Sequence, residues 1–251
     1  MDVVVLTIFP EMVEPYFSFG MIRKAVEEGL LRVSAMNIRD HASGKHKVTD
    51  DKPYGGGCGM VMKPEPLAAS IKAALETCPG AKVIHVTPQG RPFNQSIAME
   101  LSAERGLVFV CGRYEGIDER ICDEYIDDEI SIGDYVLTGG ELAALVITDA
   151  VIRHIPGVLG GEESAQKDSF SDGLLEHAHY TRPYLFEGRN VPDVLVSGNH
   201  AGIDAWRLET SLVRTMLKRP DLMEHRQLTP DETKILQRWR RTLDAMLDMK
   251  Q

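Results

Sequence analysis

The chain has 251 residues, of which 43% are hydrophobic and 26% are charged, and this ordinary globular composition excludes extensive disorder. Its formal net charge of −10 argues against binding nucleic acid by bulk attraction alone. The acidity is uneven, because residues from Leu174 onward include 12 Lys and Arg against 11 Asp and Glu, whereas the preceding part includes 16 against 27. The C-terminal third is therefore nearly neutral and has clustered arginines.

No targeting or membrane-spanning segment is recognisable. The N-terminus lacks the basic start and cleavage site of a signal peptide, and the longest apolar run, 142–152, is too short to cross a membrane. The four cysteines show neither a C-x-x-C pair nor zinc-finger spacing; they are Cys58, Cys78, Cys111 and Cys122. We therefore expect a cytoplasmic protein whose cysteines are reduced and buried.

Strand-like and helix-like segments alternate through the first 160 residues. The expected strands are 3–8, 31–36, 82–86 and 108–111, and the expected helices are 11–29, 64–76, 94–104 and 137–155. This alternation predicts an α/β domain with a largely parallel sheet. A polar loop over 40–62 is far longer than an ordinary connection, which suggests a functional role.

After residue 160 the sequence becomes polar and glycine-containing, as in a flexible connector, and extended segments marked by proline follow. One helix is expected around 201–218. The last helix should begin with Thr229 as N-cap and Pro230 as first helical residue, and Glu232 completes a capping box. The predicted organisation is a catalytic domain over 1–160, a linker over 161–173 and a smaller helical domain over 174–251.

Three glycine-bearing segments, 87–91, 112–116 and 131–141, follow predicted strands or precede a helix. Ligands of parallel sheets bind where strand ends meet such loops, and glycine permits close backbone approach. These segments indicate a small-molecule pocket lined by backbone, although three ordinary tight turns would leave the same pattern. The glycine run 55–57 matches neither a P-loop nor G-x-G-x-x-G, which disfavours a nucleotide triphosphatase or a dinucleotide site.

Two other functional classes stay open on the residues alone. A Cys-dependent hydrolase could use Cys111 with His85, although a cysteine that ends an apolar strand is usually inert. A non-catalytic RNA-binding protein could use Arg207, Arg214 and Lys218, whose spacing places them on one helical face. That face could equally be an ordinary solvated stripe.

Taken together, a series of motifs resembles one family, the bacterial tRNA (guanine(37)-N(1))-methyltransferases of the SPOUT superfamily. The motifs are PYGGGCGM at 53–60, TPQGR at 87–91, CGRYEGIDER at 111–120, SIGDYVLTGGE at 131–141, RHIPGVLG at 153–160, DSF at 168–170, HYTRP at 179–183 and SGNH at 197–200. The resemblance covers nearly the whole chain in order and is weakest near the C-terminus.

The resemblance implies a SPOUT fold, in which a deep trefoil knot lies in a mostly parallel sheet, plus a smaller mainly helical C-terminal domain that helps hold tRNA. It implies an obligate homodimer, with each active site at the subunit interface. It also implies transfer of a methyl group from S-adenosylmethionine to N1 of guanine 37, beside the anticodon, with Mg²⁺ assisting.

Site residues are implied in the same way. The S-adenosylmethionine pocket should use His85, Val86, Thr87, Pro88, Gly112, Glu115, Ile132, Gly133, Tyr135, Leu137, Gly139 and Gly140. The implied general base is Asp168, assisted by Arg153, although each taken alone would be read as an ordinary surface charge. Two residues depart from the family pattern: His85 stands where the family has Tyr, and Ala143 where it has Pro.

Overall fold

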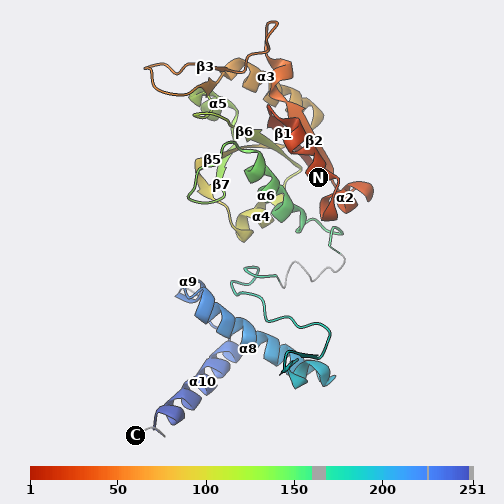
Figure 1. Ribbon diagram of the computed structural model, residues 1–251, viewed down its shortest axis with the longest axis vertical. Coiled ribbons are helices and arrows are strands. Elements are labelled where there is room, and N and C mark those ends of the chain that lie inside the picture. The colour runs from red at the N-terminus through yellow and green to blue at the C-terminus, as the bar shows by residue number, and fades with distance from the viewer. Residues whose placement is uncertain (160–167, 225, 249–251) are drawn as a thin grey trace. The chain divides into compact units, whose positions relative to one another are not determined.

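The computed structural model describes residues 1–159, 168–224 and 226–248, and the chain divides into two compact units, Met1–Ala165 and Gln166–Gln251 (Figure 1). Residues 161–167 of the predicted linker lie outside the described residues, and its remainder, 168–173, belongs to the second unit.

The first unit is built on a five-stranded sheet in which every pair of neighbouring strands is parallel. The strand order is β2-β1-β6-β5-β7. The strands are β1 (Asp2–Thr7), β2 (Arg32–Asn37), β5 (Lys82–Pro92), β6 (Gly106–Cys111) and β7 (Asp128–Ser131). The predicted α/β class with a largely parallel sheet is therefore confirmed.

Helices cover both faces of this sheet, and alternate residues of each strand face opposite layers. On β1, Val3 and Val5 pack with α2, α4 and α6, whereas Val4 and Leu6 pack with α3 and α5. The covering helices are α2 (Gly20–Glu27), α3 (Pro64–Thr77), α4 (Gln95–Ser102), α5 (Glu119–Tyr125) and α6 (Glu141–Ile152). Both layers bury continuous cores, so the strand ends are held rigidly.

Several predicted elements need correction. The single helix expected over 11–29 is wrong, because Phe19 is extended and Gly20 has a φ of +59°, which breaks the chain between two short helices. The shorter elements of this unit are η1 (Pro10–Met12), α1 (Glu14–Phe17), η2 (Ile38–His41), β3 (Asp50–Asp51) and β4 (Val61–Met62). The last three lie within or at the edge of the segment expected to be loop.

Other differences concern the segments around the glycine loops. Strand β5 continues to Pro92 instead of ending at Val86, and α6 spans only part of the predicted 137–155 helix. Both α5 and β7 were missed by the sequence patterns. Of the cysteines expected to be buried, Cys58 is exposed and Cys122 is half-buried, and all four are free thiols.

The second unit is mainly helical. Its elements are β8 (Leu185–Phe186), β9 (Arg189–Asn190), η3 (Asp193–Val196), α8 (His200–Lys218), α9 (Asp221–Glu224) and α10 (Pro230–Asp248). The predicted capping box is confirmed: the Thr229 amide donates to Glu232 Oε2 at 2.8 Å, and the Glu232 amide donates to Thr229 Oγ1 at 3.2 Å. Arg226 also donates to Glu232 Oε1 at 2.6 Å, which ties the start of α10 to the preceding loop.

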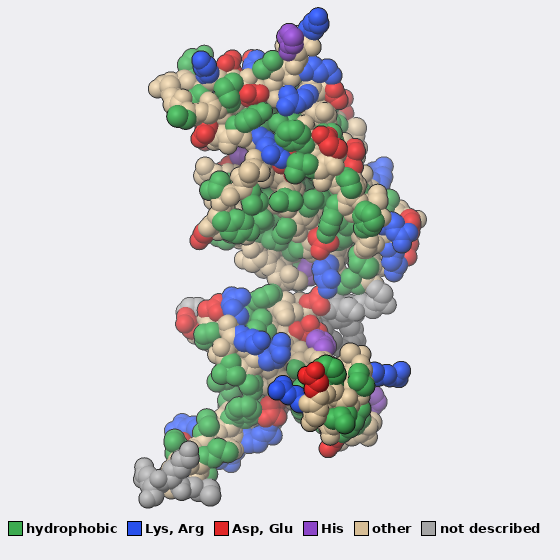
Figure 2. Space-filling model, viewed as in Figure 1, with side chains coloured by type: hydrophobic (Ala, Val, Ile, Leu, Met, Phe, Trp, Pro, Cys, Tyr) green, Lys and Arg blue, Asp and Glu red, His purple; other side chains and the backbone are tan. Residues whose placement is uncertain are grey.

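Helices α8 and α10 enclose an exposed apolar groove of about 490 Å³, and hydrophobic side chains are visible on the surface of this unit in Figure 2. The predicted basic stripe on α8 is only partly exposed. Arg207 and Lys218 are exposed, but Arg214 is half-buried and its Nε atom is sealed from solvent. Among the described residues, no helix combines the length and apolarity needed to cross a bilayer.

Candidate active site

One cavity of about 460 Å³ lies at the carboxyl ends of β5, β6 and β7, where the three glycine-bearing loops meet. The structure brings all twelve predicted cofactor-binding residues to its lining, together with Gln89, Arg113, Glu119, Cys122, Glu129 and Ala143 among others. Loops that leave adjacent parallel strands converge at one sheet edge, which explains why segments distant in sequence share one cavity.

The first wall of the cavity is a bulge within β5. Val86 and Arg91 both pair with Ile130 of β7, so the four residues between them leave the ladder without ending the strand. Gly90 sits where a side chain could not: an added Cβ would lie 2.3 Å from the Ile130 amide nitrogen. The glycine of this motif is therefore required by backbone-to-backbone approach.

The second wall follows β6. The amide of Glu115 donates to the Met60 carbonyl at 3.0 Å, and the Met62 amide donates to the Gly116 carbonyl at 2.9 Å. These bonds attach the segment that contains the glycine run to the cavity loop. An added Cβ at Gly59 would meet the Glu115 side chain at 2.3 Å, so the absence of a side chain at Gly59 leaves room for Glu115.

The third wall is the loop before α6. Gly133 has a φ of +144°, and the Tyr135 hydroxyl donates back to the Ile132 carbonyl at 3.3 Å. The Gly140 amide donates to the Gly112 carbonyl at 3.1 Å. A Cβ on Gly140 would lie 2.9 Å from Cys111 Cα, so this glycine lets α6 begin directly against the end of β6.

A buried polar network beneath these loops escaped the sequence reasoning. Glu141, only 1% exposed, accepts from Thr7 Oγ1 at 2.6 Å and from Arg113 Nε at 3.1 Å. Its only sequence signal is its place directly after two glycines at the start of a helix. Since a buried carboxylate must be paired to be tolerated, this network fixes Arg113, and with it the loop after β6.

The electrostatics of the cavity favour a cationic ligand. Three carboxylates, those of Glu115, Glu119 and Glu129, belong to the lining, whereas its one guanidinium, that of Arg113, is already paired with Glu141 at 2.9 Å. Burial lowers the pKa of His85 below its ordinary value, although the neighbouring Glu129 opposes this. The imidazole is therefore neutral at neutral pH and does not offset the carboxylates.

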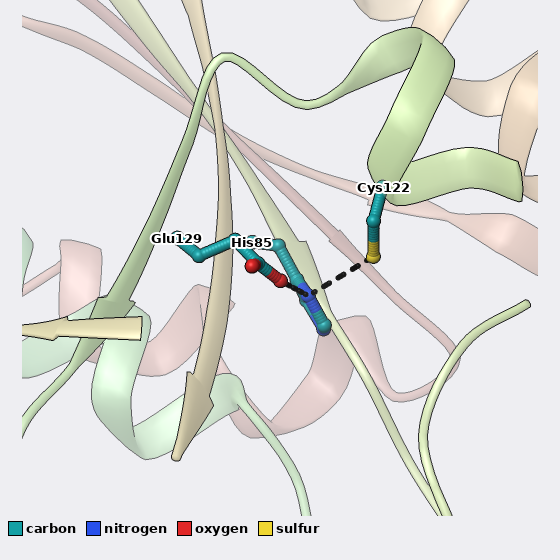
Figure 3. A group of neighbouring side chains, drawn as sticks. All are labelled: His85, Cys122 and Glu129. Atoms are coloured by element: carbon teal, nitrogen blue, oxygen red, sulfur yellow. Dashed lines mark hydrogen bonds and ion pairs between the residues drawn. The ribbon is translucent and has the colours of Figure 1, made fainter. Parts of the chain in front are cut away.

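His85 belongs to a compact group with Cys122 and Glu129 in the cavity wall (Figure 3). Its Nδ1 lies 3.2 Å from Glu129 Oε1 and 3.8 Å from Cys122 Sγ. Burial and the nearby Glu129 raise the pKa of Cys122 to about 12. His85 thus has partners from α5 and β7, two elements that the sequence patterns missed.

The alternative of a Cys111 hydrolase is disfavoured by the geometry. Cys111 is fully buried, and burial together with the charge of Glu141 raises its pKa well above the ordinary value. A nucleophilic cysteine needs an accessible, readily formed thiolate, and Cys111 offers neither.

Arg153 and Asp168 do not belong to the cavity lining. Arg153 caps the C-terminal end of α6, whose first turn lines the cavity, and a helix of 12 residues is about 18 Å long. Arg153 is therefore remote from the cavity of its own chain. Asp168 belongs to the second unit, where its carbonyl accepts from the Ser171 amide at 3.2 Å.

The lining suits S-adenosylmethionine. The cavity volume lies within the range of small-molecule sites, five glycines belong to its lining, and its carboxylates complement a sulfonium cation. Mg²⁺ is matched less well. Within the described ranges, two groups of three side chains could hold a metal, and each contains histidine nitrogen, whereas Mg²⁺ prefers oxygen ligands.

Comparison with known proteins gives a consistent result. The family model described as tRNA (Guanine-1)-methyltransferase TrmD matches residues 1–225. Relatives named tRNA (guanine-N(1)-)-methyltransferase include one from Desulfatibacillum aliphaticivorans, 54% identical over 97% of this chain and 93% of its own length. Others come from Staphylococcus carnosus, 54% identical over 95% and 97%, and from Geobacter sp., 56% identical over 88% of each chain. The chain therefore belongs to the tRNA (guanine-1)-methyltransferase family.

Proposed function

We propose that this protein transfers a methyl group from S-adenosylmethionine to N1 of guanine 37 in tRNA, acting in the cytoplasm as a homodimer. Membership in the family identifies it as a tRNA (guanine-N(1))-methyltransferase, which needs a methyl donor. The observation that carries the choice of donor is the cavity at the strand ends, which gathers all twelve predicted cofactor-binding residues and three carboxylates.

The cofactor supplies a methyl group that is already activated on a positively charged sulfonium. The chain's own task is to position it and to prepare the base. Neutral guanine carries a proton on N1, so its lone pair is unavailable for attack. We assign Asp168 to accept that proton and Arg153 to stabilise the negative charge that develops on the neighbouring exocyclic oxygen.

The position of Arg153 supports a site shared between two chains. Because α6 extends about 15 Å from Ala143 in the cavity lining to Arg153, we assign Arg153 to the cavity of a second copy. The exposed apolar residues Leu142 and Val146 of α6, 54% and 48% exposed, give this helix a surface suited to burial by a second chain.

The SPOUT assignment and its deep trefoil knot belong to the same proposal. Support comes from the loops after β6 and β7. They are joined by the hydrogen bond from the Gly140 amide to the Gly112 carbonyl and by a bridge between Arg113 and Gly139. The proposed knot requires these two loops to lie against each other, as they do here. The helical second unit is assigned to hold the tRNA.

Methyl transfer to defined transcripts tests the proposal. Labelled S-adenosylmethionine should methylate an unmodified tRNA transcript with guanine at position 37, and the matched transcript with adenine there should accept no label. Primer extension should stop at position 37, because an N1 methyl group blocks the pairing edge of the base. Equal labelling of both transcripts would overturn the assignment of position 37.

Mixing two inactive variants tests the shared site. Asp168→Ala removes the base, and Gly140→Leu places a side chain against Val86 and Cys111, so each pure variant should be inactive. Heterodimers contain one intact cavity and one intact Asp168, and mixtures should regain part of the activity. If heterodimers form, as checked by mass, and no activity returns, the site is not shared.

A further inference from the structure

His85, Cys122 and Glu129 come from β5, α5 and β7, yet their side chains converge on one point of the cavity wall (Figure 3). The histidine ring lies between the other two. Its Nδ1 is 3.2 Å from the Glu129 carboxylate and 3.8 Å from the Cys122 sulfur, and all three potential ligand atoms lie within 4.8 Å of one another.

These separations resemble the edges of a tetrahedral metal site. Zn²⁺ binds nitrogen and oxygen at about 2.0–2.2 Å and sulfur at about 2.3 Å. Tetrahedral angles then place ligand nitrogen and oxygen about 3.3 Å apart, and nitrogen and sulfur about 3.6 Å apart. Both calculated edges are within a few tenths of an ångström of the corresponding distances at His85, and the third pair, the Glu129 oxygen and the Cys122 sulfur, lies within 4.8 Å.

We propose that His85, Cys122 and Glu129 form a three-ligand site for a Zn²⁺-class divalent cation, with its fourth coordination position open to the cavity. The mixed set of thiol, imidazole and carboxylate selects a borderline-soft ion and disfavours Mg²⁺ or Ca²⁺. All three residues line the cavity, which leaves an entry path and room for a fourth ligand. On binding, the Cys122 thiol releases its proton to solvent and coordinates as thiolate.

The site extends beyond the proposed methyl transfer and depends on residues of this particular chain. His85 supplies the imidazole nitrogen, and the other two ligands come from α5 and β7. The linear spacing of 37 residues between His85 and Cys122 matches no zinc motif, so only the fold brings the ligands together. Without metal, the same three groups would form only a local hydrogen-bonded cluster.

Metal titration of the full-length protein tests the site. A second group, Glu176, His177 and His179, could also bind Zn²⁺, so the measurements use a His179→Gln background. Competition with a chromogenic chelator measures the Zn²⁺ affinity, and absorption spectra with Co²⁺ detect a sulfur ligand by its thiolate-to-cobalt charge transfer. We expect one ion per chain and a charge-transfer band.

Substitutions then identify the ligands. Loss of an outer-shell partner alone costs about 10- to 100-fold in metal affinity, so Cys122→Ser and Glu129→Gln should each weaken Zn²⁺ binding at least tenfold. Cys58→Ser, which removes an exposed thiol outside the cluster, is the matched control and should change nothing. Only Cys122→Ser should abolish the cobalt band.

Circular dichroism checks that the variants fold. Glu129→Gln keeps the shape of a side chain that is 40% exposed, so it remains informative if Cys122→Ser does not fold. Unchanged Zn²⁺ affinity in Glu129→Gln would overturn the proposal, as would a cobalt complex of the parent protein without a charge-transfer band. The three side chains would then form a hydrogen-bonded cluster and no metal site.

Discussion

The two compact units are stabilised in different ways. In the first, both faces of the sheet bury continuous apolar layers, and its largest fully buried side chains include Phe109, Leu6 and Leu101. In the second, Leu174 and Leu212 are the only buried hydrophobic residues among those described, whereas Leu217 and Leu247 are 79% and 65% exposed. The first unit can therefore maintain a rigid cavity, and the second relies more on local polar contacts.

This difference in packing indicates which unit needs a rigidly positioned backbone. At Gly90 and Gly140 an added Cβ would lie only 2.3 Å and 2.9 Å from neighbouring backbone atoms, so these positions need a framework that does not move, and the buried sheet supplies it. The second unit, which is proposed to bind tRNA, can be less rigid, because many weak contacts together provide the affinity for a large substrate. Four predictions test this comparison, from the largest expected effect to the smallest.

The first prediction separates cofactor binding in one unit from proton removal by the other. Asp168→Asn keeps the side-chain shape but cannot accept a proton, so single-turnover methyl transfer should fall by about 10²–10⁴-fold while affinity for S-adenosylmethionine is retained. Asp172→Asn, at an exposed carboxylate nearby, is the control and should stay active. A near-normal rate in Asp168→Asn would remove this residue from the mechanism.

The second prediction concerns packing. Leu101→Ala leaves a cavity in the fully buried core of the first unit and should lower its free energy of unfolding by about 2–5 kcal/mol. Leu217→Ala, at an exposed position of the second unit, should change stability by only about 0.5 kcal/mol. Both tryptophans, Trp206 and Trp239, lie in the second unit, so urea unfolding followed by tryptophan fluorescence reports that unit separately.

Far-ultraviolet circular dichroism reports both units in the same titrations. Leu101→Ala should shift the dichroism transition and leave the fluorescence transition in place. Coincident shifts in both signals would show that the two units unfold as one, and the contrast between them would then not extend to stability.

The third prediction concerns the capping box. Burial alone would raise the pKa of Glu232, but hydrogen bonds from Arg226 and the Thr229 amide outweigh it, so the pKa lies below the ordinary glutamate value of 4.5. A lowered pKa contributes stability above pH 4.5 that is lost as the pH falls through the folded value. Glu232→Gln should cost the second unit about 0.5–2 kcal/mol at neutral pH.

Urea titrations from pH 7 down to pH 3 measure this effect by tryptophan fluorescence. The difference in free energy of unfolding between the parent protein and Glu232→Gln should shrink as the pH drops below 4.5, the ordinary pKa of a glutamate. A difference that stays constant over the whole range would mean that the charge of Glu232 contributes nothing.

The smallest effect is expected for tRNA binding. The exposed Arg207 and Lys218 of α8 should each release counterions on contact with phosphate, so the double Gln variant should flatten the salt dependence of tRNA affinity by about one unit per lost contact. Arg23→Gln with Lys24→Gln, at exposed positions of α2, is the matched control. Identical salt slopes would mean that α8 carries an ordinary solvated stripe.

Much of the framework could be predicted from the sequence, because strand and helix periodicities are local signals. The boundaries of β1 and α3 and the first residue of α10 lie within two residues of expectation, and the capping residues Thr229 and Glu232 form the predicted bonds. The break at Gly20 was missed because an amphipathic pattern continues across it while the backbone reverses sign in φ.

The candidate site also has features that the sequence predicts and features that it does not. The glycine loops could be predicted because each follows a strand or precedes a helix. The buried Glu141, Arg113 and Thr7 network could not, since its members are distant in sequence and ordinary in type. The same holds for the cluster of His85 with Cys122 and Glu129, two of whose members come from elements with weak patterns. The roles of Asp168 and Arg153 remain predictions drawn from resemblance.

The bulge in β5 has a consequence for the entropy of ligand binding. Because Val86 and Arg91 both pair with Ile130 in the sheet, the four residues between them are tethered at both ends and can adopt few alternative paths. A free loop would lose about 1–2 kcal/mol of conformational freedom per residue when a ligand ordered it. Most of that loss is here incurred during folding, so a ligand in this cavity meets a wall that is already ordered.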